Sequence, residues 1–245
     1  MMTKSKESGL NSLLKIDYED DNKIWLTNSL TLRKIIGIMG MALPLLLFGV
    51  LYLDNGLQYP LESISHYYYT RAGSIFVIVL SLLAFFLIVY KGKEPADFYI
   101  SLSAGIFALL AVLFPTSNIT DICGDPAKKY AVTILPVSNF RMYFHYTMAA
   151  LFFICLSYMC FFLFTKSNME PSKRGSKKIL RNRIYRICAV LMFLAILVPF
   201  AGLLKIIPSY YFSKYPLTFW METLAVESFG FAWLVKGETL FKDHN

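Results

Sequence analysis

The sequence has few charged residues and few of the residue types with which enzymes do chemistry. Only 16% of its 245 residues are charged, whereas soluble domains average about 25%. It holds 3 histidines and 4 cysteines. A disordered chain is excluded because 56% of the residues are hydrophobic, and disorder requires a composition that cannot bury enough apolar surface.

The cysteines fit neither a disulfide framework nor a zinc site. Cys155, Cys160 and Cys188 lie in apolar stretches, where a thiol behaves as a small hydrophobic group, and Cys123 stands alone in a loop. The sequence also lacks a glycine-rich phosphate loop, a nucleophile elbow and a secretory cleavage site. We therefore expect no cofactor and no nucleic-acid partner.

Long apolar blocks dominate the chain and give it a mean hydropathy of +0.52. About 20 apolar residues in a helix cross the hydrocarbon of a bilayer, and a backbone in lipid must satisfy its own hydrogen bonds. The blocks therefore predict an all-α integral membrane bundle of six transmembrane helices. Its expected spans are Ile35–Leu53, Ala72–Tyr90, Phe98–Phe114, Tyr143–Phe164, Ile187–Leu204 and Leu217–Val235.

The Lys and Arg residues predict the orientation of these spans. If the N-terminus is cytoplasmic, 18 of the 24 Lys and Arg residues fall in inner segments, as is typical of cytoplasmic loops. We expect a multi-pass protein of the cell inner membrane with both termini in the cytoplasm. The expected division is a tail over 1–33, a transmembrane domain over 34–236 and a second tail over 237–245.

The most basic segment is the loop expected over residues 166–186. Basic residues near a membrane surface attract anionic lipids by about 1 kcal/mol each. This loop is either a flank that fixes the topology or a binding site for an anionic lipid. Beyond the lipid bilayer itself, the partners left open are a second copy of the chain and a cytoplasmic protein.

A few polar side chains fall within or beside the spans, in what this orientation makes the outer half of the membrane. Ionisable groups there cost at least about 2.5–3.5 kcal/mol each and usually face protein or water. Spans two, four and six all begin at that side, so their polar ends are expected to converge. We predict a ligand-binding cluster of His66, Tyr68, Arg71, His145, Glu222 and Glu227.

The two carboxylates of the last span are five residues apart, which is about 140° around a helix. Glu222 and Glu227 therefore cannot both point into one site. We expect one of them to pair with Arg71 or Arg141, and the other to bond to a hydroxyl or to stay protonated.

Three interpretations of the cluster stay open. It is a structural cluster that locks the bundle, or a cavity that binds or passes a lipid headgroup, small solute or ion. The third interpretation is an intramembrane metal-dependent hydrolase, because His66, His145 and Glu222 supply three zinc ligands and leave a position for water. The spacing gives this last alternative little support, since no helix carries a paired-histidine motif.

Four motifs suggest a family. The stretches SISHYYYT (63–70), FPT (114–116), NRIYRIC (182–188) and FGFAWLVKGE (229–238) resemble an uncharacterised family of bacterial six-helix multi-pass membrane proteins. The first-loop layout is loosely similar to DRAM/Frag/Sfk-type proteins. The resemblance implies a six-helix bundle and, because some such proteins accompany bacterial defence systems of the CRISPR type, an accessory role. The resemblance also favours a functional role for seven residues: His66, Tyr67, Tyr68, Tyr69, His145, Trp220 and Glu222.

The sequence as a whole favours a membrane protein without enzymatic activity. The favoured function is to bind or pass a lipid headgroup, small solute or ion at the outer polar cluster. The metal-dependent hydrolase and the accessory protein of a defence system are the alternatives.

Overall fold

The computed structural model describes residues 29–92, 94–120, 127–167 and 175–241. This part of the chain is helical, and its only strand-like feature is an isolated bridge between Thr70 and Ala131. The long elements are α2 (Ser29–Asn55), α3 (Gly73–Val89), α4 (Pro95–Leu113), α5 (Asn139–Tyr158), α6 (Ser176–Leu203) and α8 (Leu217–Lys236). The short elements are the 3-10 helices η2 (Ile64–Tyr69) and η3 (Ala127–Tyr130), the π-helix η4 (Met159–Leu163) and α7 (Ser209–Lys214).

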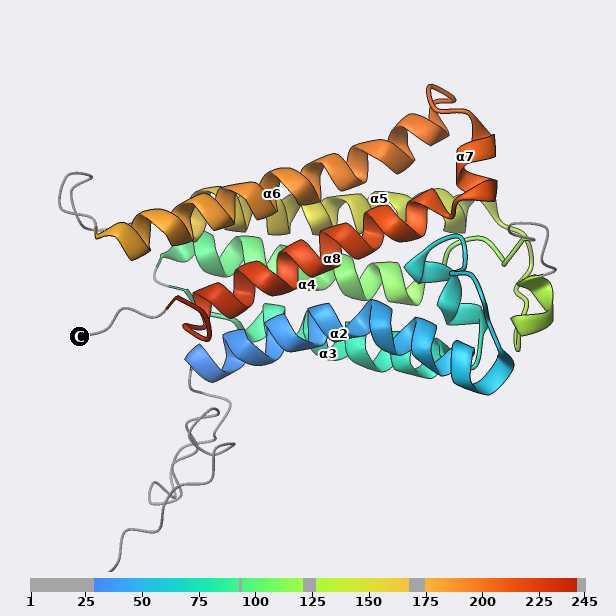
Figure 1. The fold of residues 1–245 in the computed structure, drawn as a ribbon, viewed down its shortest axis with the longest axis horizontal. Coiled ribbons are helices and arrows are strands. Elements are labelled where there is room, and N and C mark those ends of the chain that lie inside the picture. The colour runs from blue at the N-terminus through green and yellow to red at the C-terminus, as the bar shows by residue number, and fades with distance from the viewer. Residues whose placement is uncertain (1–28, 93, 121–126, 168–174, 242–245) are drawn as a thin grey trace, which may run out of the picture.

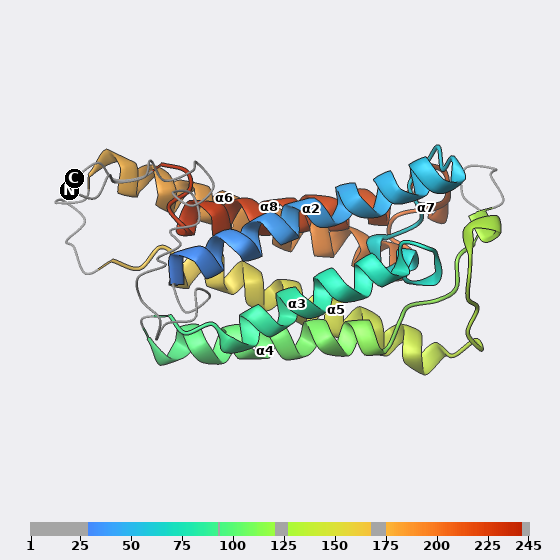
Figure 2. The same ribbon diagram turned by 90° about the horizontal axis from the view of Figure 1, so that it is seen from below.

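The long helices lie side by side and alternate in direction, so their connections gather at two ends (Figures 1 and 2). Neighbours in sequence pack together from α2 through α6, and α8 closes the ring by packing against both α6 and α2. One end carries the connections that follow α2, α4 and α6. The other end carries the start of α2, the start of α6 and the end of α8.

Four helices are long and apolar enough to cross a membrane: α2, α4, α6 and the continuous stretch of α5 with η4. They identify the chain as a multi-pass membrane protein whose helices contact the lipid bilayer. Helix α3 is apolar but shorter, with 17 residues. Helix α8 has 20 residues and carries two carboxylates, Glu222 and Glu227.

The fifth expected span begins earlier than its apolar block indicates. The structure starts α6 at Ser176, so much of the segment expected as the basic loop 166–186 is helix. The physical reason is that Lys, Arg and Leu are good helix formers and continue the helix beyond the apolar stretch. The remainder, 168–174, lies outside the described residues, as does most of the tail expected over 1–33.

Close backbone contact holds α2 against α8 at two glycines. A Cβ atom added to Gly37 would lie 2.8 Å from the carbonyl oxygen of Gly230, and one added to Gly230 would lie 2.7 Å from that of Gly37. Small residues likewise bring α3 and α4 together, since Ser101 Oγ donates to the carbonyl of Leu87 at 2.6 Å. Small side chains are the usual means of close helix packing in lipid, where no hydrophobic force joins helices.

Candidate functional site

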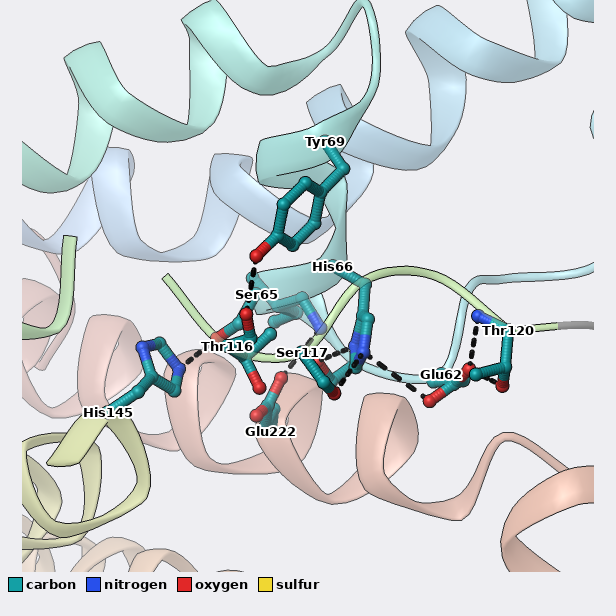
Figure 3. A network of polar contacts seen from close by, with 11 residues as sticks. Glu62, Ser65, His66, Tyr69, Thr116, Ser117, Thr120, His145 and Glu222 are labelled. Atoms are coloured by element: carbon teal, nitrogen blue, oxygen red, sulfur yellow. Dashed lines mark hydrogen bonds and ion pairs between the residues drawn. The ribbon is translucent and has the colours of Figure 1, made fainter. Parts of the chain in front are cut away.

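Polar side chains from four segments meet at the end of the bundle that carries the connection after α2. We call this group the polar cap and define it as Glu62, Ser65, His66, His145 and Glu222 (Figure 3). The 3-10 helix η2 lies at its centre, and His145 of α5 and Glu222 of α8 reach it from two sides.

His145 uses both of its ring nitrogens. Its Nδ1 lies 2.9 Å from the carbonyl oxygen of Ala111 and 3.0 Å from that of Phe114, at the end of α4. Two carbonyl oxygens can only accept, so Nδ1 carries the proton. Nε2 therefore accepts from the Ser65 hydroxyl, whose Oγ lies 3.0 Å away. His145 thus satisfies carbonyls at the end of α4, which have no partner within that helix, and ties α4 to η2.

Glu222 ties α8 to the same 3-10 helix. The backbone N–H of Ile64, at the start of η2, donates to Glu222 Oε2 at 2.6 Å. One turn earlier, the backbone N–H of Phe219 donates to the carbonyl of Glu62 at 2.9 Å. The start of α8 therefore holds the first loop by two hydrogen bonds, one of them to a carboxylate, which is the stronger kind.

His66 is 4% exposed and also has partners for both nitrogens. Ser63 Oγ lies 2.7 Å from Nδ1, while Nε2 lies 3.4 Å from Glu62 Oε2 and 3.5 Å from Ser117 Oγ. Burial lowers the pKa of His66 from its ordinary value, and the nearby Glu62 carboxylate opposes that effect. Glu62 in turn accepts from the backbone N–H of Thr120 at 2.9 Å.

The connection after α4 is fixed to the polar cap by Tyr69. The Tyr69 hydroxyl donates to the carbonyl of Thr116, and the Tyr69 carbonyl accepts from the backbone N–H of Val132 at 2.8 Å. Burial raises the pKa of Tyr69, although the Arg141 charge opposes it, so the phenol stays a neutral donor. The first and third loops therefore fold together over the end of the bundle.

The structure brings three of the six predicted site residues together and leaves three apart. His66 lies in η2, and His145 and Glu222 bond to the neighbouring η2 residues Ser65 and Ile64. Tyr68 packs edge-on against Tyr69 instead, with ring centroids 5.2 Å apart. Whether the three grouped residues bind a ligand stays a prediction.

Arg71 and Glu227 lie apart from the polar cap. The guanidinium of Arg71 pairs with Asp54 at 3.1 Å, with 64% of the Arg71 side chain exposed. Glu227 lines a crevice between α2, α6 and α8. The expected pairing of a carboxylate with Arg71 or Arg141 is therefore wrong, because Asp54 takes Arg71 and the Pro115 carbonyl accepts from Arg141 Nε at 3.1 Å.

The metal-dependent alternative lacks a ligand set in the part of the chain that the structure describes. There, no three His, Cys, Asp or Glu side chains gather closely enough to hold a metal ion. The nitrogens of His145 face carbonyls and a hydroxyl, and Glu222 faces a backbone N–H.

A second polar region lies in the basic segment 166–186, for which the sequence left open a flank that fixes the topology or a binding site for an anionic lipid. A groove of about 590 Å³ runs along the first half of α6, and we call it the arginine groove. Arg183 and Arg186 line it together with Asn182, and Ile187, Val190 and Leu191 continue it as an apolar surface.

Two polar groups of the arginine groove have no partner among the residues that the structure describes. Asn182 is 8% exposed, and its Oδ1 makes no hydrogen bond. Arg183 forms no hydrogen bond or ion pair with any residue that the structure describes, whereas Arg186 lies over the ring of Phe161 at 5.8 Å. The signal in the sequence was the spacing of Asn182, Arg186 and Val190, which places them one turn apart on one helix face.

Comparison with known proteins adds no relative. The chain matches none of the protein families with which it was compared, and no curated protein or solved structure matches it. The resemblance suggested by the four sequence motifs stays a prediction.

Proposed function

We propose that the protein spans the membrane six times, with the polar cap on the outer side and both termini in the cytoplasm. Three observations support this topology. The six long helices alternate in direction, and α3 and α8 are enclosed in the same ring as the four apolar helices. The end opposite the polar cap carries the basic start of α6, as expected for a cytoplasmic end.

We further propose that the protein binds an anionic phospholipid at the arginine groove, without enzymatic activity. The observation that carries this proposal is the pair of guanidinium groups, Arg183 and Arg186, that line a groove continuing onto an apolar surface. Arginine is the residue best suited to phosphate, which it binds through paired N–H donors. The buried Asn182 Oδ1, which has no partner, would accept from a headgroup hydroxyl.

The length of α6 places these groups at the correct depth. The helix has 28 residues, which at about 1.5 Å each exceeds the roughly 30 Å of hydrocarbon. If Leu203 lies at the outer boundary, about 20 residues of membrane-crossing helix reach back to Ile184. Arg183 then lies at the inner headgroup level, and Arg186 lies less than one turn inside it, from where its long side chain reaches back to the headgroups. Anionic lipids there attract basic residues by about 1 kcal/mol each.

The polar cap fits the structural interpretation better than a binding site. His145 and His66 use both ring nitrogens, and Glu222 accepts from a backbone N–H, all within the protein. A ligand would have to replace these bonds, and each buried group left unpaired costs about 1–3 kcal/mol. We propose that the cap locks the two outer loops to α4, α5 and α8.

Native mass spectrometry of the purified protein, with phosphatidylglycerol or phosphatidylcholine added, tests the lipid proposal. We expect the native protein to retain phosphatidylglycerol in preference to phosphatidylcholine. The double variant Arg183→Ala and Arg186→Ala is expected to lose that preference. Its matched control, Lys177→Ala with Arg181→Ala, removes the same charge from the same end of α6 outside the groove and should keep it.

Two results would overturn the lipid proposal. One is equal retention of the two lipids by the native protein. The other is the same loss in both double variants, since that would assign the effect to overall charge. Asn182→Leu refines the test, because it should weaken phosphatidylglycerol, whose headgroup carries hydroxyls, more than phosphatidic acid, which has none.

A further inference from the structure

A crevice of about 420 Å³ lies between α2, α6 and α8, and nothing above assigns it a role. Its walls include Met41 of α2, Ile187 and Leu191 of α6, and Glu227 and Phe231 of α8. Apart from Glu227 and the hydroxyl of Ser228, the side chains that line the crevice are apolar. The crevice meets the arginine groove along α6, because Ile187 and Leu191 line both.

Glu227 is the unusual member of this wall. It lies near the middle of α8, and among the described residues it has no hydrogen-bond or ion-pair partner. Glu222, five residues earlier on the same helix, is bound by a backbone N–H. An ionisable side chain within a membrane is expensive and usually has a partner, so an unpaired one points to a ligand.

The chemistry of the wall selects a hydrophobic cation. A carboxylate attracts positive charge, and the Phe231 ring, one turn along the same face, can bind a cation through its π-electrons. The Met41 thioether is polarisable and adapts its shape to a ligand. An anion would be repelled by Glu227, and a neutral molecule would leave the carboxylate unpaired.

We propose that this crevice binds a hydrophobic organic cation of drug-like size, with Glu227 as its counter-charge. A volume of about 420 Å³ falls in the usual range of small-molecule sites, about 300–1,000 Å³, and suits one such molecule rather than a partner helix. The ligand enters from the surrounding lipid, since the crevice opens on the helix surface. This site takes a charge opposite to that of the arginine groove's ligand and stands independently of it.

The test uses tetraphenylphosphonium and tetraphenylborate, two ions of the same shape and opposite charge, with the full-length protein in uncharged detergent. Equilibrium dialysis is expected to show preferential binding of the cation by the native protein. Glu227→Gln should lower its affinity about tenfold and remove the preference between the two ions. Glu238→Gln, an exposed carboxylate beyond the end of α8, is the matched control and should bind as the native protein does.

A second variant keeps the test decisive if Glu227→Gln does not fold. Met41→Lys places an ammonium group beside Glu227, so it should fold and exclude the cation. Unchanged cation binding in Met41→Lys or in folded Glu227→Gln would overturn the proposal, as would equal binding of the two ions by the native protein. So would a native dimer that covers the crevice and binds neither ion.

The arginine variants separate this proposal from the lipid proposal. Arg183→Ala with Arg186→Ala should bind tetraphenylphosphonium within about twofold of the native affinity, even though it loses phosphatidylglycerol. Loss of cation binding in that double variant would contradict an independent site at Glu227.

Discussion

At the polar cap, His145 uses both ring nitrogens and Glu222 is bound by a backbone N–H. On α6, Asn182 Oδ1 and Arg183 have no partner among the described residues. Both regions place polar atoms at an end of an apolar bundle, but only the cap satisfies them internally. A cluster of polar side chains therefore does not by itself identify a binding site. Polar atoms that are hydrogen-bonded within the protein stabilise the fold, whereas polar atoms without such a partner are available to a ligand.

The largest effect is expected from removing His145. His145→Leu leaves the Ser65 hydroxyl without its acceptor and the carbonyls of Ala111 and Phe114 without their donor. We expect the free energy of unfolding to fall by about 2–4 kcal/mol, since each buried polar group left unpaired costs about 1–3 kcal/mol. Tyr146→Leu, at the neighbouring and more exposed position, is the control.

Thermal unfolding in detergent, followed by tryptophan fluorescence, measures this change. If His145→Leu is as stable as Tyr146→Leu, the polar cap does not lock the loops and the contrast between the two regions fails.

Substituting Gln for each carboxylate of α8 should change the free energy of unfolding by different amounts, both smaller than the effect of His145→Leu. Glu222→Gln weakens the charge-assisted bond from the Ile64 N–H, and we expect a loss of about 1–2 kcal/mol. Glu227→Gln removes no hydrogen bond or ion pair to any residue in the described part of the chain, so its stability should equal or exceed that of the native protein. The same unfolding measurement compares them. Equal destabilisation by both substitutions would show that Glu227 has a structural partner.

The pH dependence of the free energy of unfolding tests whether His66 is buried in its neutral form. Burial lowers the pKa of His66 from its ordinary value of 6.5, while Glu62 opposes that effect. Below about pH 6.5 the unfolded chain therefore binds a proton that the folded protein does not, and stability falls as the pH drops. The loss is at most about 1.4 kcal/mol per pH unit.

The measurement compares unfolding at pH 7.5 and pH 5.5 in the native protein and in His66→Gln. The groups facing His66 are Glu62, Ser63 and Ser117. Most of the slope should disappear in His66→Gln. A native protein that gains stability on acidification would contradict a buried, neutral His66.

The smallest effect on stability is expected in the arginine groove. Arg183→Ala removes no hydrogen bond or ion pair with a described residue, so unfolding in lipid-free detergent should change by no more than about 0.5 kcal/mol. Added phosphatidylglycerol should then stabilise the native protein and not the variant. A large loss without lipid would mean that Arg183 has a structural role like that of the cap residues.

Much of the helical architecture could be predicted from the apolar blocks. Residues that lie in lipid are apolar, and their backbone must be helical because lipid offers it no hydrogen-bond partners. The block at Phe98–Phe114 corresponds to a helix over Pro95–Leu113, which begins with a capping box formed by Glu94 and Asp97. The apolar block placed the start of this helix at Ile187, whereas α6 begins at Ser176. Hydropathy indicates only which residues lie in lipid, and a helix continues beyond the lipid where the following residues have high helix propensity. Six spans remain a proposal, because α3 is short and α8 carries two carboxylates.

The site could be predicted only in part. The meeting of His66, His145 and Glu222 followed from helix direction, which fixes the end at which each side chain lies. Their partners could not be read from the sequence, because Ile64 and Ala111 contribute backbone atoms and any residue type would supply them. Arg71 lies in the turn between η2 and α3, so a helical pattern could not place its side chain. The unpaired state of Glu227 depends on how α8 is rotated, which a weak hydrophobic asymmetry does not fix.

The most direct test of the account is a structure of the protein determined in a bilayer that contains phosphatidylglycerol. The account predicts a phosphate within hydrogen-bond distance of Arg183 and Arg186, a headgroup hydroxyl at Asn182 Oδ1, and no ligand among Ser65, His145 and Glu222. A lipid or ion bound within the polar cap, with the arginine groove empty, would contradict it.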